Sequence, residues 1–273
     1  VDIRQPKIVL PEIEANPENT ILSVWDYEVA FDELLLSNVC FELKENEKVA
    51  IVGANGTGKT TLLREIFKNK NAAITIAEDA KVGFLSQIHG EMLDESKTVY
   101  EEFEALGFEN KTEIAEYLKG YCFEEETLNN QISMLSGGEQ NLLQLAKIAV
   151  SGANLLLLDE PTSHLDTYSQ IALEKAIEEY KGAVLMVSHD FYNIVNCADY
   201  VLFVDDKSIR RMRIRSFRKM IYENHFDKEY LELEQKKKEL ETRIAVALKA
   251  SDIKTAKNLC EQLEEVVETL CKK

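Results

Sequence analysis

The sequence predicts an α/β fold with a largely parallel sheet. Short, fully apolar segments recur along the chain, as expected for buried strands, and segments with helical spacing lie between them. Such alternation of buried strands and helices is typical of parallel sheets. The clearest predicted strands are Val49–Val52, Leu155–Leu158, Ala183–Val187 and Tyr200–Val204.

The other segments complete the expected order of elements. Residues 1–20 are polar and contain prolines, which indicates an extended lead-in. Strand-like patterns are expected over residues 21–52, and shorter strands over residues 72–87. Apolar residues at helical spacing predict helices at Thr61–Phe67, 97–130, Ser136–Val150 and Ile171–Tyr180.

The composition changes from about Phe226, where charged residues dominate. Apolar positions continue at helical spacing to Leu248 and again from Ile253, which predicts two amphipathic helices folded into a hairpin. The alternative is a pair of helices packed on the main domain. The expected organisation is a lead-in at 1–20, a main domain at 21–225 with a helical subdomain at about 97–150, and a hairpin at 226–273.

The composition restricts the possible classes of function. A net charge of −17 is unfavourable for general duplex binding, in which phosphate neutralisation dominates. The five cysteines form no C-x-x-C pair, which favours reduced thiols in a cytoplasmic protein over disulfides or zinc. No apolar run is long enough for a membrane span, so no direct membrane insertion is expected. The chain begins with Val1, which suggests a fragment of something longer.

A glycine-rich loop between a predicted strand and a predicted helix indicates nucleotide binding. Glycines let backbone N–H groups turn toward phosphate oxygens, and the following helix directs its positive end to the same place. Lys59 would bridge the β- and γ-phosphates of ATP, and Thr60 would ligate Mg²⁺. The expected nucleotide-binding residues are Gly53, Ala54, Asn55, Gly56, Thr57, Gly58, Lys59, Thr60 and Thr61.

Two carboxylates end the predicted strand Leu155–Leu158. Asp159 fits an anchor for Mg²⁺, and Glu160 could accept a proton from the attacking water or orient that water. A second glycine-rich segment, Leu135–Gln140, precedes a helix and forms another helix start that can receive an anion. One nucleotide rarely needs two such sites.

Over roughly Ile21–Val204 the sequence resembles the ATP-binding-cassette (ABC) family. The resemblance rests on motifs in the family order, with Gln87 as the Q-loop residue and His189 as the switch histidine. The other motifs are Gly53–Thr60 (Walker A), Leu135–Gln140 (signature), Leu155–Glu160 (Walker B) and Ser163–Asp166 (D-loop). The resemblance implies a P-loop fold with an antiparallel β part and a helical subdomain.

By the same resemblance, two cassettes face each other head to tail, within one polypeptide or as a homodimer. Ser136 and Gly138 would then contact the γ-phosphate of an ATP held by the other cassette. His189 would contact the γ-phosphate held by this chain, and Gln87 would sense Mg²⁺ and the attacking water. Glu160, His189, Gln87 and Lys59 are thus the expected catalytic residues. Thr60, Gln87 and Asp159 are the expected metal site.

The family also stacks an aromatic side chain on adenine, upstream of Walker A. Trp25, Tyr27 and Phe31 lie in range, and their spacing does not align cleanly with the family pattern. Phe31 is the first choice and Tyr27 the second. An ordinary core position is equally consistent with any one of these three aromatic residues.

Within the family, the chain most resembles the F subfamily, whose members join two cassettes and act at the ribosome, some as antibiotic-protection factors. The sequence Glu160-Pro-Thr-Ser163-His-Leu-Asp departs from the subfamily pattern only at Ser163. The lead-in would make this the second cassette. Lys207–Lys219 is rich in Lys and Arg without an acidic residue, which suggests a local contact with the ribosome, RNA or another anionic partner; a solvated charged face is the alternative. Asn141 replaces the basic residue that many transporters place after the signature.

The alternative is the ATP-binding subunit of a membrane transporter, in which the acidic segment 97–130 would face the membrane partner. A chromosome- or repair-type ATPase is disfavoured, because those proteins insert a very long coiled coil between Walker A and the signature.

Overall fold

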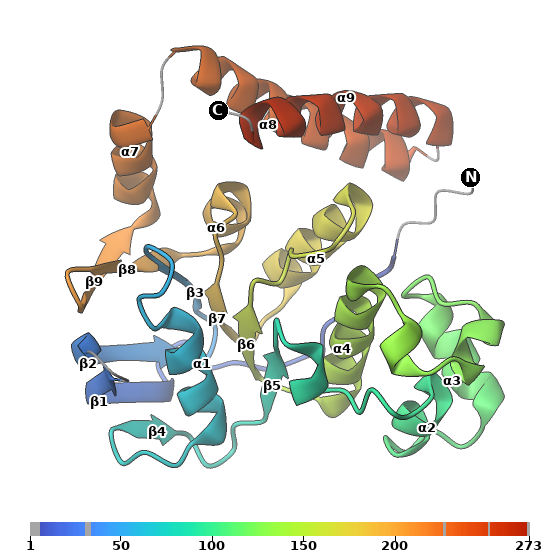
Figure 1. Cartoon of the computed structure of the whole chain (residues 1–273), viewed down its shortest axis with the longest axis horizontal. Coiled ribbons are helices and arrows are strands. Elements are labelled where there is room, and N and C mark those ends of the chain that lie inside the picture. The colour runs from blue at the N-terminus through green and yellow to red at the C-terminus, as the bar shows by residue number, and fades with distance from the viewer. Residues whose placement is uncertain (1–5, 31–33, 226–227, 251, 272–273) are drawn as a thin grey trace.

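A six-stranded sheet forms the centre of the molecule, in the order β5-β6-β7-β3-β8-β9. The computed structural model describes residues 6–30, 34–225, 228–250 and 252–271 (Figure 1). Neighbouring strands pair in parallel from β5 to β8, and only β9 is antiparallel to its neighbour. The strands are β3 (Lys48–Val52), β5 (Val82–Leu85), β6 (Leu155–Asp159), β7 (Ala183–Val187), β8 (Tyr200–Asp205) and β9 (Ser208–Arg213).

Both faces of this sheet are buried, which explains the continuous apolar runs in its strands. In β6, Leu156 and Leu158 face one apolar core, and Leu155 and Leu157 face the other. Helices α4 (Gly137–Ser151), α5 (Thr167–Glu179) and α6 (Phe191–Cys197) contribute to the first core. Helix α1 (Lys59–Lys68) contributes to the second core. The predicted parallel α/β class is therefore confirmed.

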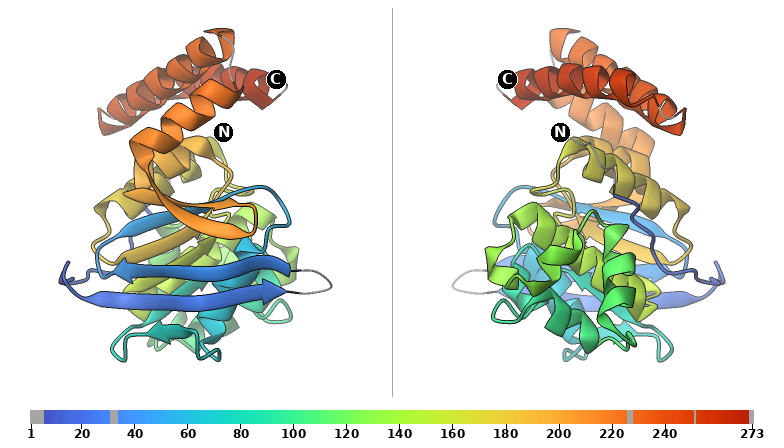
Figure 2. Two further views of the ribbon diagram at one scale, coloured as in Figure 1. Left: turned by 90° about the vertical axis from the view of Figure 1, so that its left-hand side faces the viewer. Right: turned by 90° about the vertical axis from the view of Figure 1, so that its right-hand side faces the viewer.

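A small antiparallel sheet covers the α1 side of the second core (Figure 2). Its order is β2-β1-β4, with β1 at Thr20–Ala30, β2 at Leu34–Lys44 and β4 at Ile74–Ile76. Strand β1 contains a residue with positive φ, Asp26 at 54°, where the register with β2 shifts. This sheet brings β2 close to the loop that precedes α1.

A helical part lies beyond β5 (Figure 2). It contains α2 (Val99–Glu104), α3 (Lys111–Lys119) and short 3₁₀ turns at His89–Glu91, Glu125–Asn129 and Ile132–Met134. Thr98 caps α2 and Asn110 caps α3, each by accepting a backbone N–H three residues later. The predicted helical subdomain is present, although its segment 97–130 is broken into these shorter pieces.

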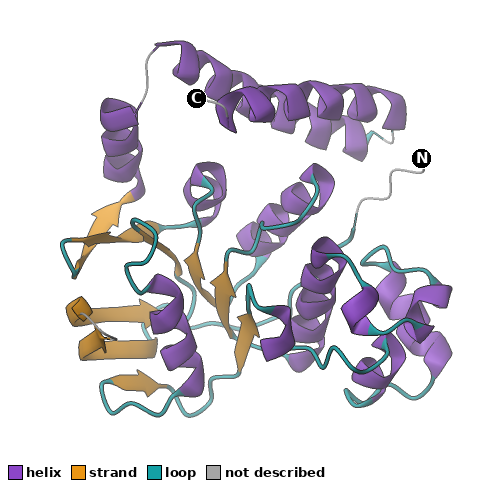
Figure 3. Cartoon of the chain, in the orientation of Figure 1, coloured by secondary structure: helices purple, strands orange, loops and turns teal. Residues whose placement is uncertain are grey.

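The C-terminal region forms the predicted helical hairpin, α8 (Lys228–Lys249) and α9 (Ile253–Cys271) (Figure 3). The two helices share an apolar core that includes Ile244 and Leu263. The partly buried Tyr168 and Ile171 of α5 pack against the same core. The two helices therefore form a hairpin that is also packed on the main domain, which combines the two predicted arrangements.

Helix α7 (Ile214–His225) was not predicted, because the sequence suggested only a basic run in that region. Helix α5 begins before the predicted Ile171, since Asp166 caps it by accepting the N–H of Ser169 at 2.9 Å. The limits predicted for the domains stay predictions. In the described part of the chain, no helix combines the length and apolar character needed to cross a membrane.

Candidate nucleotide-hydrolysis site

The glycine-rich loop joins β3 to α1, as the motif requires. Gly56 and Gly58 have φ values of 77° and 90°, a region that side chains rarely adopt, so glycine lets the loop curl before the helix. At Gly53 an added Cβ would lie 2.8 Å from Cβ of Val204, so the loop also needs glycine to pack on β8. The amide groups at the start of α1 thus lie beside the loop and favour an anion.

The ammonium of Lys59 lies inside this loop. Its Nζ donates to the carbonyl oxygens of Gly53 at 2.9 Å and Ala54 at 2.6 Å. Burial lowers the pKa of Lys59, and the carboxylates of Glu160 and Asp159 act in the opposite direction. A buried cation held by neutral oxygen atoms is well placed to receive a polyanion.

Thr60 and Asp159 form a second polar pair next to the loop. The hydroxyl of Thr60 donates to Oδ1 of Asp159 at 2.9 Å. Oδ2 of Asp159 is buried and has no hydrogen-bond partner among the described residues. Burial raises the pKa of the Asp159 carboxyl. An unpaired carboxylate oxygen beside a hydroxyl is a donor set that suits Mg²⁺.

Glu160 and His189 form the third pair, at the ends of adjacent strands. The Glu160 carboxylate accepts the backbone N–H of His189 at 3.2 Å, and Nε2 of His189 lies 3.3 Å from its Oε1. Burial raises the pKa of Glu160 and lowers the pKa of His189, the latter assisted by the charge of Lys59. Glu160 also has a φ of 50°, a strained conformation for a residue with a side chain.

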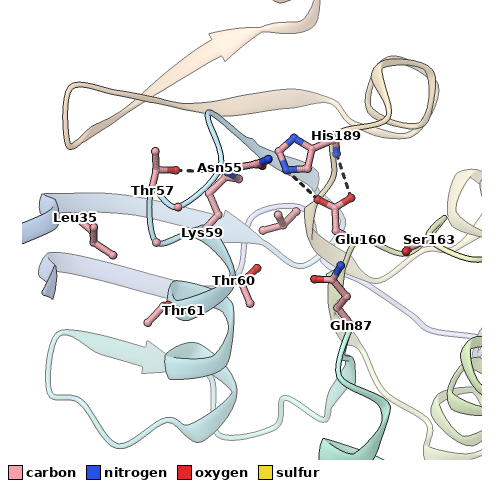
Figure 4. Close-up of a pocket in the computed structure, with 13 residues that line it drawn as sticks. Leu35, Asn55, Thr57, Lys59, Thr60, Thr61, Gln87, Glu160, Ser163 and His189 are labelled. Atoms are coloured by element: carbon pink, nitrogen blue, oxygen red, sulfur yellow. Dashed lines mark hydrogen bonds and ion pairs between the residues drawn. The ribbon is translucent and has the colours of Figure 1, made fainter. Parts of the chain in front are cut away.

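Lys59, Thr60, Glu160 and His189 line a cavity of about 640 Å³, and Asp159 lies behind it, bonded to Thr60 (Figure 4). Its size lies within the range of small-molecule sites. Figure 4 shows Gln87 and Ser163 beside Glu160, and Thr57, Thr61 and Leu35 on the other side. The cavity is lined by Leu35, Asn55, Gly56, Thr57, Gly58, Lys59, Thr60, Thr61, Gln87, Glu160, Ser163, Val187 and His189.

The structure therefore brings the predicted Walker, Q-loop and switch residues together. Gly53 and Ala54 contribute through their carbonyl bonds to Lys59. Ser163 and Val187 are further lining residues that the sequence did not assign to the site. In the part of the chain that the structure describes, no group of three or more His, Cys, Asp and Glu side chains could hold a metal on its own. A metal at Asp159 and Thr60 would need ligands from phosphate and water.

Ser136 and Gly138 do not line this cavity. Ser136 is exposed and caps α4 by accepting the N–H of Glu139 at 3.3 Å, and the Glu139 side chain accepts from Ser136 in return. An added Cβ at Gly138 would lie 2.6 Å from the carbonyl oxygen of His164. The glycine thus allows α4 to pack on the loop after β6.

In the described part of the chain, the aromatic candidates for adenine stacking do not line the cavity. Trp25 is 73% exposed and Tyr27 is 5% exposed in the core between the sheets, and neither lines the cavity. The prediction for Phe31 falls outside the described residues. Leu35 of β2 lines the cavity instead, and sequence reasoning missed it. An aliphatic residue in the run Leu34-Leu35-Leu36 carries no signal that distinguishes it from the core.

A phosphate-binding loop, a buried carboxylate and a glutamate–histidine pair at the carboxyl ends of parallel strands define a P-loop nucleotide-binding domain. Residues 36–163 match the family model of the ABC transporter. The chain therefore contains an ATP-binding-cassette ATPase domain, and this cassette is similar to those of F-subfamily proteins.

Curated relatives and solved structures agree with this assignment. ABC transporter F family member 5 of Arabidopsis thaliana is 35% identical over 209 residues, which are 74% of this chain and 30% of that protein. The energy-dependent translational throttle protein EttA of Escherichia coli (strain K12) is 35% identical over 185 residues, 64% of this chain and 33% of that protein. The chain thus spans about a third of the length of these relatives.

Among solved structures, a dimeric ATP-binding cassette bound to ADP and Pi in a post-hydrolysis state has a TM-score of 0.59 at 24% identity. It is matched over 71% of this chain and 99% of that one. A bacterial Atm1-family ABC exporter with ATP bound has a TM-score of 0.63 at 18% identity, over 78% of this chain and 43% of that one. These similarities show a shared fold.

Proposed function

We propose that the chain is one cassette of an F-subfamily protein, that it hydrolyses MgATP in a site completed by a second cassette, and that it acts on the ribosome in the cytoplasm. The observation that carries the chemistry is the cavity in which Lys59, Thr60, Gln87, Glu160 and His189 converge.

In this proposal Asp159 and Thr60 hold Mg²⁺, which supplies charge neutralisation at the phosphates. Lys59 leaves the loop carbonyls to bind the β- and γ-phosphates. Glu160 accepts a proton from, or orients, the water that attacks the γ-phosphate, and His189 holds the Glu160 carboxylate and contacts the γ-phosphate. Gln87 lies beside Glu160, where it can help position that water (Figure 4).

The requirement for a second cassette is supported by residues near the signature and near Gln87 that are exposed in this chain. Ser136 caps α4 and does not line the chain's own cavity, in keeping with a role on another nucleotide. Met134, two residues before it, is 76% exposed, and Ile88, directly after Gln87, is 55% exposed. Exposed large apolar side chains at both positions are consistent with surfaces that a partner covers.

The ribosomal role is supported by the F-type relatives and by the basic segment Lys207–Lys219. Within this segment, Arg210 pairs with Asp205, and Arg211 lies 3.6 Å from the ring centroid of Tyr200. Arg213, Arg215 and Arg218 are exposed and make no ion pair with the described residues. Since exposed arginines suit phosphate backbones, α7 is the proposed contact with RNA.

The chemical half of the proposal is tested by ATP hydrolysis. Glu160→Gln keeps the size of the side chain and removes the base, so turnover should fall about 10²- to 10³-fold while ATP binding persists, a loss typical for one such group. Undiminished turnover would refute the role of Glu160.

The ribosomal half is tested with the longer protein that contains this cassette. With Glu160→Gln in place and ATP present, the protein should co-sediment with ribosomes in a sucrose gradient, and Lys59→Ala should abolish this. Recovery in a membrane complex instead would favour the transporter alternative and overturn the ribosomal assignment.

A further inference from the structure

Helix α4 carries two buried amide side chains that hold walls of the nucleotide cavity. Asn141 is 2% exposed and Gln144 is 1% exposed, and they lie one turn apart on the same face of the helix. Burying an amide costs free energy unless it is hydrogen-bonded, so the hydrogen-bond partners of these side chains indicate their structural role.

The side chain of Gln144 is bound at both ends by one residue. Its Oε1 accepts the backbone N–H of Ser86 at 3.0 Å, and its Nε2 donates to the carbonyl oxygen of Ser86 at 3.1 Å. Ser86 directly precedes Gln87, which lines the cavity. Gln144 therefore fixes the backbone from which Gln87 projects.

The side chain of Asn141 joins two separate segments. Its Nδ2 donates to the carbonyl oxygen of Ser163 at 2.5 Å, and its Oδ1 lies 2.9 Å from Nε2 of His89. Ser163 lines the cavity, and His89 lies two residues after Gln87. A carbonyl can only accept a hydrogen bond, so the amide nitrogen must face Ser163 and the amide oxygen must face His89. His89 consequently carries its proton on Nε2 and donates it to Asn141.

We propose that Asn141 is a positioning residue for ATP hydrolysis: with Gln144, it holds the Gln87 segment and Ser163 at a fixed separation across the cavity. The sequence singled out Asn141 and Ser163 as separate departures from family patterns, and the structure shows that they are in contact. Both cavity walls are thereby tied to the helix whose first turn contains the signature.

The expected effect is on turnover more than on affinity. Asn141 bonds to neither the phosphate loop nor Lys59, whereas its partner Ser163 lies beside Glu160 (Figure 4) and its partner His89 follows Gln87 by two residues. Asn141→Ala should therefore lower kcat about tenfold, and KM for ATP should change by less than about threefold, the pattern of an interaction that acts in the transition state.

Two further variants of the whole chain distinguish the hydrogen bond from Asn141 to Ser163 from the one between Asn141 and His89. Asn141→Asp keeps an acceptor for His89 but loses the donor to Ser163, so kcat should fall while a slowly exchanging Nε2–H signal of His89 persists in the NMR spectrum. Asn141→Ala should lose both hydrogen bonds, so kcat should fall and the His89 signal should disappear. The double variant His89→Ala/Asn141→Ala should be no slower than Asn141→Ala, because the two residues act through one bond.

Asn193→Ala is the matched control, since Asn193 is a fully buried asparagine on α6 outside this network. It should keep the kcat of the parent chain and the His89 signal. The proposal is overturned if Asn141→Asp retains full kcat, or if Asn141→Ala changes kcat no more than Asn193→Ala does. Should Asn141→Ala not fold, as judged by circular dichroism, Asn141→Asp decides the matter by kcat and the His89 signal, and His89→Ala by kcat.

Discussion

At the scale of single residues, Glu160 is held in an unfavourable state. Its side chain is largely buried, its pKa is raised by that burial, and its φ is 50°. A carboxylate that is deprotonated under these conditions is a better proton acceptor than one in water. Strain and desolvation at a catalytic residue reduce the stability of the fold, so the same features should be visible in unfolding measurements.

Glu160→Gln should therefore raise the melting temperature, and more so at high pH. A carboxyl whose pKa is raised on folding binds its proton more tightly in the native state, so its contribution to stability falls as pH rises above the unfolded pKa of about 4.3. The amide removes this loss. Calorimetry near pH 8 should show a gain in stability, and the gain should shrink toward about pH 4.5. A gain independent of pH would contradict the raised pKa of Glu160.

The placement of Lys59 and Thr60 in the cavity could be predicted from the sequence because it depends on local geometry. A strand, a glycine loop and a helix position Lys59 and Thr60 with little help from the rest of the chain. The apolar wall could not be predicted in this way, because Leu35 reaches the cavity through the pairing of β1 with β2. Asn141 was visible in the sequence only as a departure, since its partners lie 52 and 22 residues away along the chain.

At the scale of elements, the hairpin α8–α9 rests on α5 and α6 through charged as well as apolar contacts. Glu174 of α5 faces Glu241 and Lys237 of α8 and Asp190 at the start of α6, and it accepts a hydrogen bond from Asn196. Burial, and then the charges of Glu241 and Asp190, raise the pKa of Glu174 to about 7. Lys237 also lies 3.8 Å from the ring centroid of Tyr192, three residues after His189.

Docking of the hairpin should therefore weaken as pH rises through 7. Glu174 is protonated in the docked state below its raised pKa, and ionisation above that pKa places a charge beside Glu241 and Asp190. The loss between pH 5 and pH 8 should be on the order of 1–3 kcal/mol. Hydrogen exchange of α8 and α9 amides measures it, and Glu174→Gln should remove the pH dependence. Unchanged protection in the parent chain across this range would show that Glu174 does not couple to the hairpin.

The hairpin itself could be predicted because its apolar spacing is local. The packing of the hairpin on α5 could not be predicted, since no periodic pattern around Tyr168 and Ile171 indicates a partner helix. For α7 the sequence does contain a helical pattern, because Ile214, Phe217, Met220 and Ile221 recur at helical spacing and pack against the main core. The dense basic residues between them suggested only a surface run.

At the scale of the whole molecule, the acidic net charge and the basic α7 surface have different consequences. A charge of −17 opposes general binding to nucleic acid, so any contact with RNA depends on a few exposed cations. Arg215→Glu/Arg218→Glu should reduce ribosome retention of the Glu160→Gln protein by about tenfold or more at physiological salt and leave ATP hydrolysis unchanged.

The control for this surface is Lys254→Glu/Lys257→Glu, which reverses two exposed cations on α9. This variant should retain the parent affinity for ribosomes. Equal loss in both variants would show that net charge, and not the α7 surface, determines the interaction.

On the proposed function, the chain's own ATP site is incomplete and its signature serves another cassette. Complementation between two inactive variants of the chain tests this composite site. Lys59→Ala damages the phosphate loop and keeps the signature. Ser136→Asp keeps the helix cap, because aspartate caps as well as serine, but places a negative charge toward a partner's γ-phosphate.

Each variant alone should hydrolyse ATP at a small fraction of the parent rate, and the parent turnover per chain should rise with protein concentration. A mixture of the two variants should recover activity, since one intact composite site forms in each mixed pair. Full activity of Ser136→Asp alone, at a rate independent of concentration, would contradict the claim.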